Sequence, residues 1–260
     1  MDSLVAINRK TITSNAVTPL STPKRSRLYH LAPIAINTPY VEGLISYICR
    51  LAEAHCVSPG ILLSKEILPA FRESYSLSFR GAYALQMDKD GVSVSSVTKP
   101  IYRKNPNEYG LLAWQYLEGL KLLTLRMDLE TLVISPTANE ILTKTTGQEL
   151  GRDLRAWCPE CFQDWVTNGL PTYEPLLWSI AIVTICPIHY QPLQSYCPHC
   201  QKAQRPLTSR TYVSLCSQCF GWLGIRVLGS ELESAGRLDQ QFEIAEQIVK
   251  VLSLQGRQQC

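Results

Sequence analysis

Residues 186–200, "CPIHYQPLQSYCPHC", contain three cysteines and two histidines. Cys186 and His189 form a C-x-x-H pair, and Cys197 and Cys200 form a C-x-x-C pair seven residues further on. Two ligands separated by two residues on a tight turn can span one edge of a zinc tetrahedron. The stretch therefore predicts metal binding at two neighbouring turns.

Two more pairs of this kind flank the stretch, Cys158/Cys161 before it and Cys216/Cys219 after it. The chain has ten cysteines and no recognisable export signal, so the cysteines are expected to be reduced thiols or metal ligands rather than disulfides. A redox C-x-x-C is conceivable for one pair but not for four close together. Four pairs supply eight ligands, which predicts two closed, structural zinc sites.

The pairing of the four turns is open at this point. A sequential arrangement gives one site of Cys158, Cys161, Cys186 and His189 and a second of Cys197, Cys200, Cys216 and Cys219. A cross-braced arrangement would join the first pair with the third and the second with the fourth. We favour the sequential arrangement because it closes shorter loops and gives the second site the spacing of a zinc ribbon. His199 is then a non-ligand, because its neighbour Cys200 already occupies the ligand position. Residues 186–200 are therefore the junction of two consecutive zinc fingers.

Composition describes an ordinary globular protein, with 45% hydrophobic and 18% charged residues among 260. The longest apolar run, residues 175–186, is too short to span a bilayer, so we expect a cytoplasmic protein without a membrane partner. The formal net charge is +3. A zinc ion held by three thiolates and an imidazole contributes −1, and one held by four thiolates contributes −2, so the zinc-loaded chain is nearly neutral. Only local patches, such as the N-terminal arm or Arg152 and Arg155, could then attract nucleic acid.

The N-terminal segment carries most of the positive charge. Residues 1–30 have a net charge of +4, with one acid, Asp2, against five candidate contact residues: Arg9, Lys10, Lys24, Arg25 and Arg27. Few apolar residues lie between them, so residues 1–30 are predicted to be a flexible basic arm. The arm is either a solvated tail or a segment that docks on nucleic acid or an acidic partner.

Residues 31–150 are predicted to form a helical domain. Apolar residues recur at helical spacing from Tyr40, a second helix is expected with Ser58 as its N-cap and Pro59 at its first position, and Pro69 is expected to end it near Leu68. The pair would resemble a helix-turn-helix, although plain helical packing is as common. An Asp-Gly signal predicts a small hairpin within residues 88–106, and another helix follows Pro106 despite Gly119.

The remaining cysteines and histidines receive structural interpretations. Cys49 and Cys56 are predicted to be packed thiols on the first helix, and His30 and His55 to be structural. The chain contains no phosphate-binding loop, no H-E-x-x-H and no G-x-S-x-G motif. Since closed zinc sites also offer no open coordination position, we expect no enzymatic activity.

The predicted order of domains is the arm (1–30), the helical domain (31–150), a tandem zinc-finger domain (151–225) and a C-terminal linker and helix (226–260). The last helix is expected to begin near Asp239 and to dock back on the protein or on a partner through one apolar face: Phe242, Ala245, Ile248, Val249 and Leu252. The predicted fold is mainly α with small zinc-ribbon β elements.

The cysteine-rich part resembles the TniQ/TnsD family of transposon target-selection proteins. In that family a tryptophan precedes the first CPxC, and Leu-Trp precedes a C-P-x-H-x-x-x-L segment that runs into a second CPxC. The matching residues are Trp157, Cys158, Pro159, Cys161, Leu177, Trp178, Cys186, Pro187, His189, Leu193, Cys197, Pro198 and Cys200. The family's N-terminal helix motif is matched more loosely by Glu42, Leu44, Ser46, Tyr47, Arg50 and Ala52, with Gly43 in place of a serine. The resemblance covers roughly residues 38–224.

The resemblance implies a non-catalytic adaptor that links a target-recognition complex to the AAA+ ATPase TnsC, which recruits the transposase. In CRISPR-associated transposons the recognition complex is an effector with guide RNA, target DNA lies nearby, and the adaptor can be a homodimer. TnsD-like members instead read a DNA site directly and generally have a longer extension than the residues after Cys219, so the short TniQ type in a prokaryotic cytoplasm is favoured here. A zinc-finger transcription regulator is a further alternative.

Overall fold

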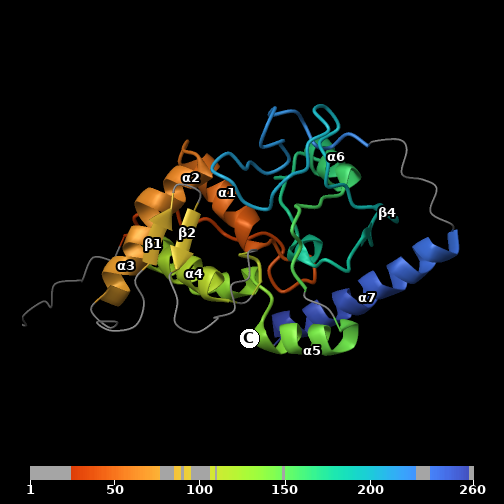
Figure 1. Ribbon diagram of the computed structural model, residues 1–260, viewed down its shortest axis with the longest axis horizontal. Coiled ribbons are helices and arrows are strands. Elements are labelled where there is room, and N and C mark those ends of the chain that lie inside the picture. Colours follow the sequence, from red (N-terminus) through yellow and green to blue (C-terminus); the bar gives the residue numbers. More distant parts are fainter. Residues whose placement is uncertain are drawn as a thin grey trace, which may run out of the picture.

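The computed structural model describes residues 25–76, 85–88, 91–94, 106–108, 110–147, 150–226 and 235–257. Helices dominate and strands are short, which confirms the predicted fold class (Figure 1). The first half comprises α1 (Leu44–Ala54), α2 (Pro59–Leu62), the π-helix η1 (Leu63–Ile67), α3 (Leu68–Ser76), β1 (Leu85–Asp88), β2 (Gly91–Val94), α4 (Leu111–Thr124), the 3-10 helix η2 (Leu129–Leu132) and α5 (Pro136–Thr146). The second half comprises α6 (Pro159–Thr167), the 3-10 helix η3 (Leu176–Ser179), β3 (Ile185–Cys186), β4 (Gln191–Pro192) and α7 (Ala235–Arg257).

Helix α1 begins four residues later than the apolar pattern predicted. The backbone N–H groups of Glu42 and Gly43 donate to the carbonyls of Ile34 and Glu174 instead of entering the helix. The Asn107 side chain then accepts a hydrogen bond from the first-turn N–H of Ile45 at 2.9 Å. An amide from a distant loop thus satisfies one of the donors that a helix N-terminus leaves unpaired.

The second helix begins as predicted but does not end at Pro69. Ser58 caps it, because its hydroxyl accepts a hydrogen bond from the N–H of Ile61. The helix then widens into η1, where the N–H of Leu68 bonds to the carbonyl of Leu63. A π turn carries one extra residue, which relieves the clash between a proline ring and the carbonyl four residues earlier. The prediction that Pro69 closes the helix is therefore wrong, and α2, η1 and α3 are continuous.

Helix α4 crosses this second helix at close range. A Cβ atom placed on Gly119 would lie 2.5 Å from the carbonyl oxygen of Ile67, so only glycine permits this approach. The predicted hairpin is present as the antiparallel pair β1–β2, in which Asp88 pairs with Gly91. The hairpin therefore begins at Leu85, a few residues before the predicted range, and its two strands lie on either side of the predicted turn.

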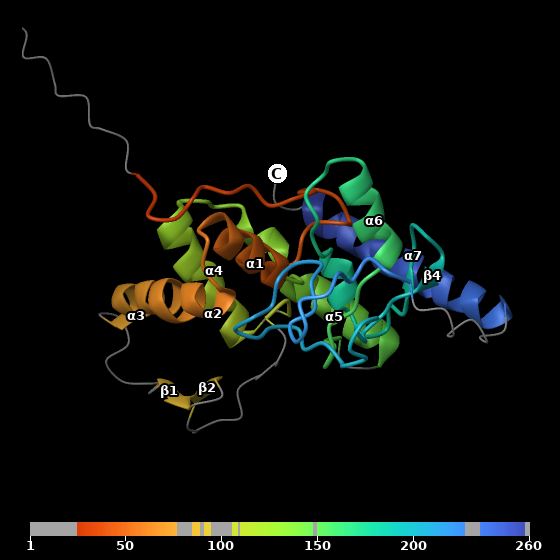
Figure 2. The same cartoon turned by 90° about the horizontal axis from the view of Figure 1, so that it is seen from above.

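Residues 25–38 lie along the helical domain, across α4 and α1 (Figure 2). Leu28 is buried and its N–H donates to the carbonyl of Leu123. Tyr29 stacks on His55 with ring centroids 4.2 Å apart. Residues 25–30, which the composition placed in the basic arm, are therefore packed against the helices.

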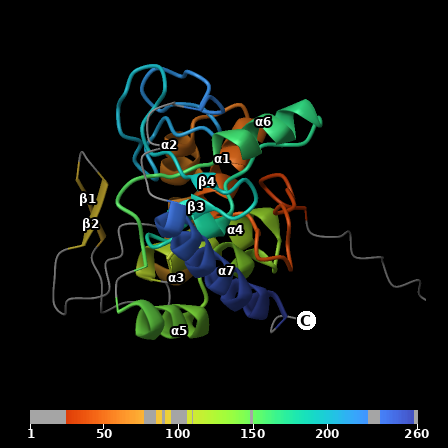
Figure 3. The ribbon, with the colours of Figure 1, turned by 90° about the vertical axis from the view of Figure 1, so that its right-hand side faces the viewer.

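Helix α7 docks back on the protein and lies across α5, β3 and η3 (Figure 3). Ala245, Ile248 and Leu252 are buried, as the apolar face predicted. The Gln255 amide donates to the carbonyl of Val133 and accepts from the N–H of Ser135, so the end of the helix is also fixed by polar contacts. No helix in the described parts of the chain has the length and apolar character that a membrane crossing requires.

Two hydrophobic cores meet at α1. One face of α1, with Leu44, Tyr47 and Ile48, belongs to the core that also holds α4, α5 and α7. An adjoining face, with Ile45 and Cys49, belongs to a second core built around the cysteine clusters. The helical part and the cysteine-rich part therefore share a helix.

Candidate metal centres

The first candidate centre is formed by Cys158, Cys161, Cys186 and His189, whose ligand atoms all lie within 4.8 Å of one another. His189 Nδ1 is 3.5 Å from Cys158 Sγ and 3.3 Å from Cys161 Sγ, and the Cys161 and Cys186 sulfurs are 3.7 Å apart. Zinc bonds of about 2.3 Å to sulfur and 2.0 Å to nitrogen give tetrahedral edges of about 3.5 to 3.8 Å. The cluster has the dimensions and the donor set of a zinc tetrahedron.

The second candidate centre is formed by Cys197, Cys200, Cys216 and Cys219, which lie equally close together. The Cys197 and Cys219 sulfurs are 3.6 Å apart, and those of Cys200 and Cys216 are 3.7 Å apart. These distances again match the edges expected around zinc. The structure thus groups the eight predicted ligands sequentially, and not in the cross-braced arrangement.

Three of the four turns share one backbone geometry. In each, the residue after the second ligand has a positive φ near 55° and donates its N–H to the carbonyl of the first ligand; these residues are Tyr190, Gln201 and Phe220. The Cys158 turn differs because Pro159 opens helix α6 directly after the ligand. The turns place non-glycine side chains in a left-handed conformation, which leaves Tyr190 and Phe220 exposed.

Outer contacts orient the ligands. Asp164 Oδ2 lies 2.8 Å from His189 Nε2, which leaves Nδ1 facing the sulfurs. A carboxylate on the second ring nitrogen of a ligating histidine is the usual arrangement around zinc. The Gln191 amide donates to Cys158 Sγ at 3.0 Å, and the N–H groups of Gln218 and Cys219 donate to Cys216 Sγ. The outer shell of each cluster therefore fits a bound cation.

The ionisation of the thiols also fits a cation. Hydrogen bonds from Cys161 and Cys186 lower the pKa of Cys158 to about 2, while hydrogen bonding to Cys158 raises the pKa of Cys161 and Cys186. Burial raises the pKa of Cys216, but the backbone N–H groups of Cys219 and Gln218 lower it to about 6. Crowded thiols hold protons between them, and a divalent metal ion would release these protons.

The two clusters differ in burial. Cys158, Cys161 and Cys186 are buried beside Trp157, Phe162 and Trp178 and against Ile45 and Cys49 of α1; these residues form one core. In the second cluster Cys219 is exposed and Cys200 is partly exposed. Cys197 and Cys216 of the second cluster lie in the same core, so the two clusters differ only in that the second also has ligands at the surface.

The cysteines and histidines that were predicted to be non-ligands lie outside both clusters. His199 Nε2 is 2.9 Å from the carbonyl oxygen of Trp222, and Cys49 is buried. His30 Nδ1 is 2.7 Å from the carbonyl oxygen of Thr124, which agrees with a structural role. The prediction for Cys56 is wrong: Cys56 follows the end of α1, with a φ of 54°, and is exposed.

Two of the five predicted basic contacts lie in the described part of the chain. Arg9, Lys10 and Lys24 lie outside the described residues, whereas Arg27 pairs with Glu66 at 2.8 Å and Arg25 is exposed. The predicted surface patch at Arg152 and Arg155 is not formed.

Both of these arginines are instead used internally. Arg152 donates to the carbonyls of Ile180 and Val183, and burial lowers its pKa to about 10. Arg155 is only 4% exposed and forms an ion pair with Glu174. Neither side chain is therefore available to a partner.

A polar network that the sequence did not reveal connects the two halves. Glu42 is buried and accepts hydrogen bonds from Arg50 and from the hydroxyl of Ser46. The same hydroxyl accepts from the N–H of Glu174, whose carboxylate pairs with Arg155.

Arg155 extends the network to the second cluster. Its guanidinium also donates to the carbonyls of Tyr212 and Leu215, just before Cys216. The network therefore runs from the start of α1 to the second cluster. Glu42, Ser46 and Arg50 all belong to the helix motif that resembles the family's, and this motif was the only sequence signal for the polar network.

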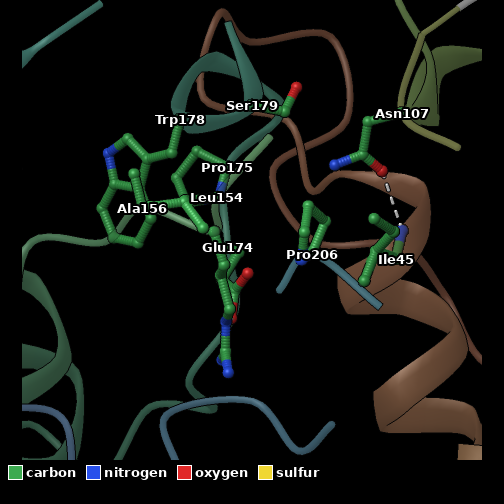
Figure 4. Close-up of a pocket in the computed structure, with 10 residues that line it drawn as sticks. Ile45, Asn107, Leu154, Ala156, Glu174, Pro175, Trp178, Ser179 and Pro206 are labelled. Carbon is green, nitrogen blue, oxygen red and sulfur yellow. Dashed lines mark hydrogen bonds and ion pairs between the residues drawn. The ribbon is translucent and has the colours of Figure 1, made fainter. Parts of the chain in front are cut away.

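A small cavity lies beside this network, between α1 and the cysteine-rich part (Figure 4). It is lined by Ile45, Asn107, Glu174 and Trp178 among others, and its volume is about 20 Å³. That is room for about one water molecule, so the cavity is not a substrate pocket.

Comparison with known families gives one match. The model of the TniQ family matches residues 33–193. No curated protein matches the chain. The matched range contains the whole first cluster and the helical part, and it ends before the second cluster.

Proposed function

Because the chain belongs to the TniQ family, we propose that it is the adaptor that links a target-recognition complex to the AAA+ ATPase TnsC, which recruits the transposase. TniQ proteins are non-catalytic accessory proteins of DNA transposition with a target-selection or adaptor role. The family match, which covers more than half of the chain, is the observation that carries the proposal.

Zinc is the metal we assign to both clusters. Thiolate and imidazole donors at tetrahedral spacing favour zinc, and four protein ligands leave no position for a reacting water molecule. The ions would be structural, which is consistent with a protein that works through its surfaces. They would fix the turns between residues 158 and 219 against the helical part.

A CRISPR effector with guide RNA is the recognition complex that we propose, with target DNA close by. Helix α7 packs within the chain, so we propose that the adaptor contacts its partners through other surfaces. The basic residues at positions 9, 10, 24 and 25 are proposed to contact one of these partners.

The test is retention of purified partners on the immobilised full-length protein at physiological salt. We expect retention of TnsC and of the effector from the same transposon, and only weak binding to DNA. Removing residues 1–24 should weaken retention without changing the helical content, since the truncated chain keeps Leu28, which is buried against the helices. Tight, sequence-selective binding of DNA in the absence of an effector would instead identify a TnsD-like reader or a transcription regulator. Light scattering on the same samples measures whether the adaptor is a dimer.

A further inference from the structure

The second cysteine cluster lies in a part of the chain without acidic side chains. From Pro175 to Ser230 the sequence contains no Asp or Glu, although the segment includes four cations: Lys202, Arg205, Arg210 and Arg226. Arg226 forms an ion pair with Glu160 at 3.7 Å. Lys202, Arg205 and Arg210 are exposed and have no ion pair with any described residue.

Exposed aromatic rings accompany these cations. Phe220, at the end of the Cys216–Cys219 turn, is 41% exposed, and the Arg210 guanidinium lies 4.8 Å from the centre of its ring. Tyr212 contacts the same ring in a tilted arrangement, with ring centroids 6.0 Å apart. Tyr196, also exposed, pairs through its backbone with Ala203, directly after Lys202.

One buried residue holds these segments together. The Gln204 side chain accepts hydrogen bonds from the N–H and the hydroxyl of Ser217. Lys202 lies two residues before Gln204 and Arg205 directly after it, while Ser217 lies three residues before Phe220. The cations and the rings are therefore parts of a single small module, residues 194–226.

The charge of the module is positive even when a metal is bound. Four cations and a zinc tetrathiolate of −2 leave a net charge of about +2, and the thiolates are partly neutralised by N–H groups. The net charge of the whole chain is then near zero, so this module and the basic N-terminal residues are two segments with an excess of positive charge.

We propose that this module binds a single strand of nucleic acid, with Phe220 and Tyr196 stacking on unpaired bases and Lys202, Arg205 and Arg210 contacting phosphates. Cations alone would suit any polyanion, but exposed rings beside them suit bases that are not hidden in a duplex. The turn around the metal site holds Phe220 rigidly, which lowers the entropy cost of stacking. The proposal does not depend on a role in transposition.

The test is fluorescence anisotropy of labelled oligouridine and oligothymidine of about 15 nucleotides, and of a duplex of equal length, with the full chain. We expect both single strands to bind more tightly than the duplex. Three phosphate contacts predict a slope of about −2 for log K against log salt concentration. A preference for RNA over DNA would show in addition that the 2′-hydroxyl is contacted; equal binding of both would show contacts to bases and phosphates alone.

Charge variants test the phosphate contacts. The double change Lys202→Gln and Arg205→Gln should make the slope of log K against log salt concentration less negative by about 1.4. The control Lys144→Gln and Lys250→Gln removes the same charge from exposed positions on α5 and α7 and should change neither affinity nor slope. An equal loss of single-strand affinity in the two double variants would overturn the proposal.

Ring variants test the stacking. Phe220→Asn keeps a residue that tolerates the left-handed conformation, and it should weaken single-strand binding roughly 5- to 100-fold. Phe220→Tyr should retain binding. Metal content and helical circular dichroism show whether each variant is folded. Unchanged binding by a folded Phe220→Asn variant, or tighter binding of the duplex than of either strand, would overturn the proposal.

Discussion

Replacing Cys186 by serine should unfold far more of the protein than replacing Cys219 by serine, although each change removes one proposed zinc ligand. Cys186 is buried in the core that includes Ile45 and Cys49 of α1. Cys219 is exposed at the edge of its turn. Cys197 and Cys216 of the second site also lie in this core, but Cys186 is fully enclosed by it, so we expect Cys186→Ser to open the core and Cys219→Ser to loosen the surface turn first.

The magnitude follows from the energy of metal binding. Structural zinc contributes apparent binding energies of about 10 to 16 kcal/mol in small zinc domains. The net stability of a globular domain is about 5 to 15 kcal/mol. Loss of the first metal can thus cancel the entire stability of the chain. For Cys219→Ser we expect one metal ion to remain bound and the helical signal of α1, α4 and α7 to be kept.

Thermal unfolding followed by circular dichroism, together with metal analysis by mass spectrometry, distinguishes the two variants. Cys56→Ser is the matched control, because Cys56 is exposed and belongs to neither cluster; its effect should stay within about 0.5 kcal/mol. If Cys186→Ser and Cys219→Ser melted alike, or if Cys186→Ser kept a cooperative helical fold, the shared core would not depend on the first metal site.

Two further substitutions test the contacts around these parts. Asp164→Ala should weaken metal binding at the first centre about 10- to 100-fold, because the carboxylate orients the ligating imidazole, while Glu160→Ala on the same helix should leave it unchanged. Competition with a chromogenic chelator measures this, and equal affinities would show that the carboxylate has no such role. Leu252→Ala should lower the free energy of unfolding by about 2 to 5 kcal/mol, since the Leu252 side chain is buried on the inner face of α7. Leu254→Ala, at an exposed position, should change it by less than about 0.5 kcal/mol in the same denaturant titration, and similar losses would contradict the docking of α7.

The features that the sequence revealed are local ones. Ligands two residues apart specify a turn, and Ser58 followed by Pro59 specifies a helix start, because both depend on backbone groups a few residues away. The apolar face of α7 was equally readable from its spacing. What α7 docks on was not readable, because α5 and β3 are far from it in the sequence.

The errors arose where a distant segment changed a local preference. Pro69 ends a regular helix, but the π turn before it removes the clash with the preceding carbonyl. The start of α1 moved because the N–H groups of residues 42 and 43 find partners on other segments. Residues 25–30 are polar and basic, yet Leu28 anchors them. Such contacts are not encoded in periodicity or composition.

The net charge of the chain follows directly from the sequence, but the conclusion about nucleic-acid binding that was drawn from it was incomplete. A nearly neutral metal-loaded chain argues against strong DNA binding, since affinity for a duplex depends largely on phosphate neutralisation. That reasoning treats the charge as evenly spread. The stretch from Pro175 to Ser230, however, contains four cations and no acid.

The metal-bound module therefore carries a net charge of about +2, which the rest of the zinc-loaded chain offsets in the total. Exposed charges interact over about 8 Å at physiological salt, so a bound strand responds to the nearest patch rather than to the sum. Lys202, Arg205 and Arg210 then set the affinity of their own surface. Nucleic-acid binding through the second cluster is thus compatible with a neutral adaptor, provided that each site is weak and that its partners are brought together in one assembly.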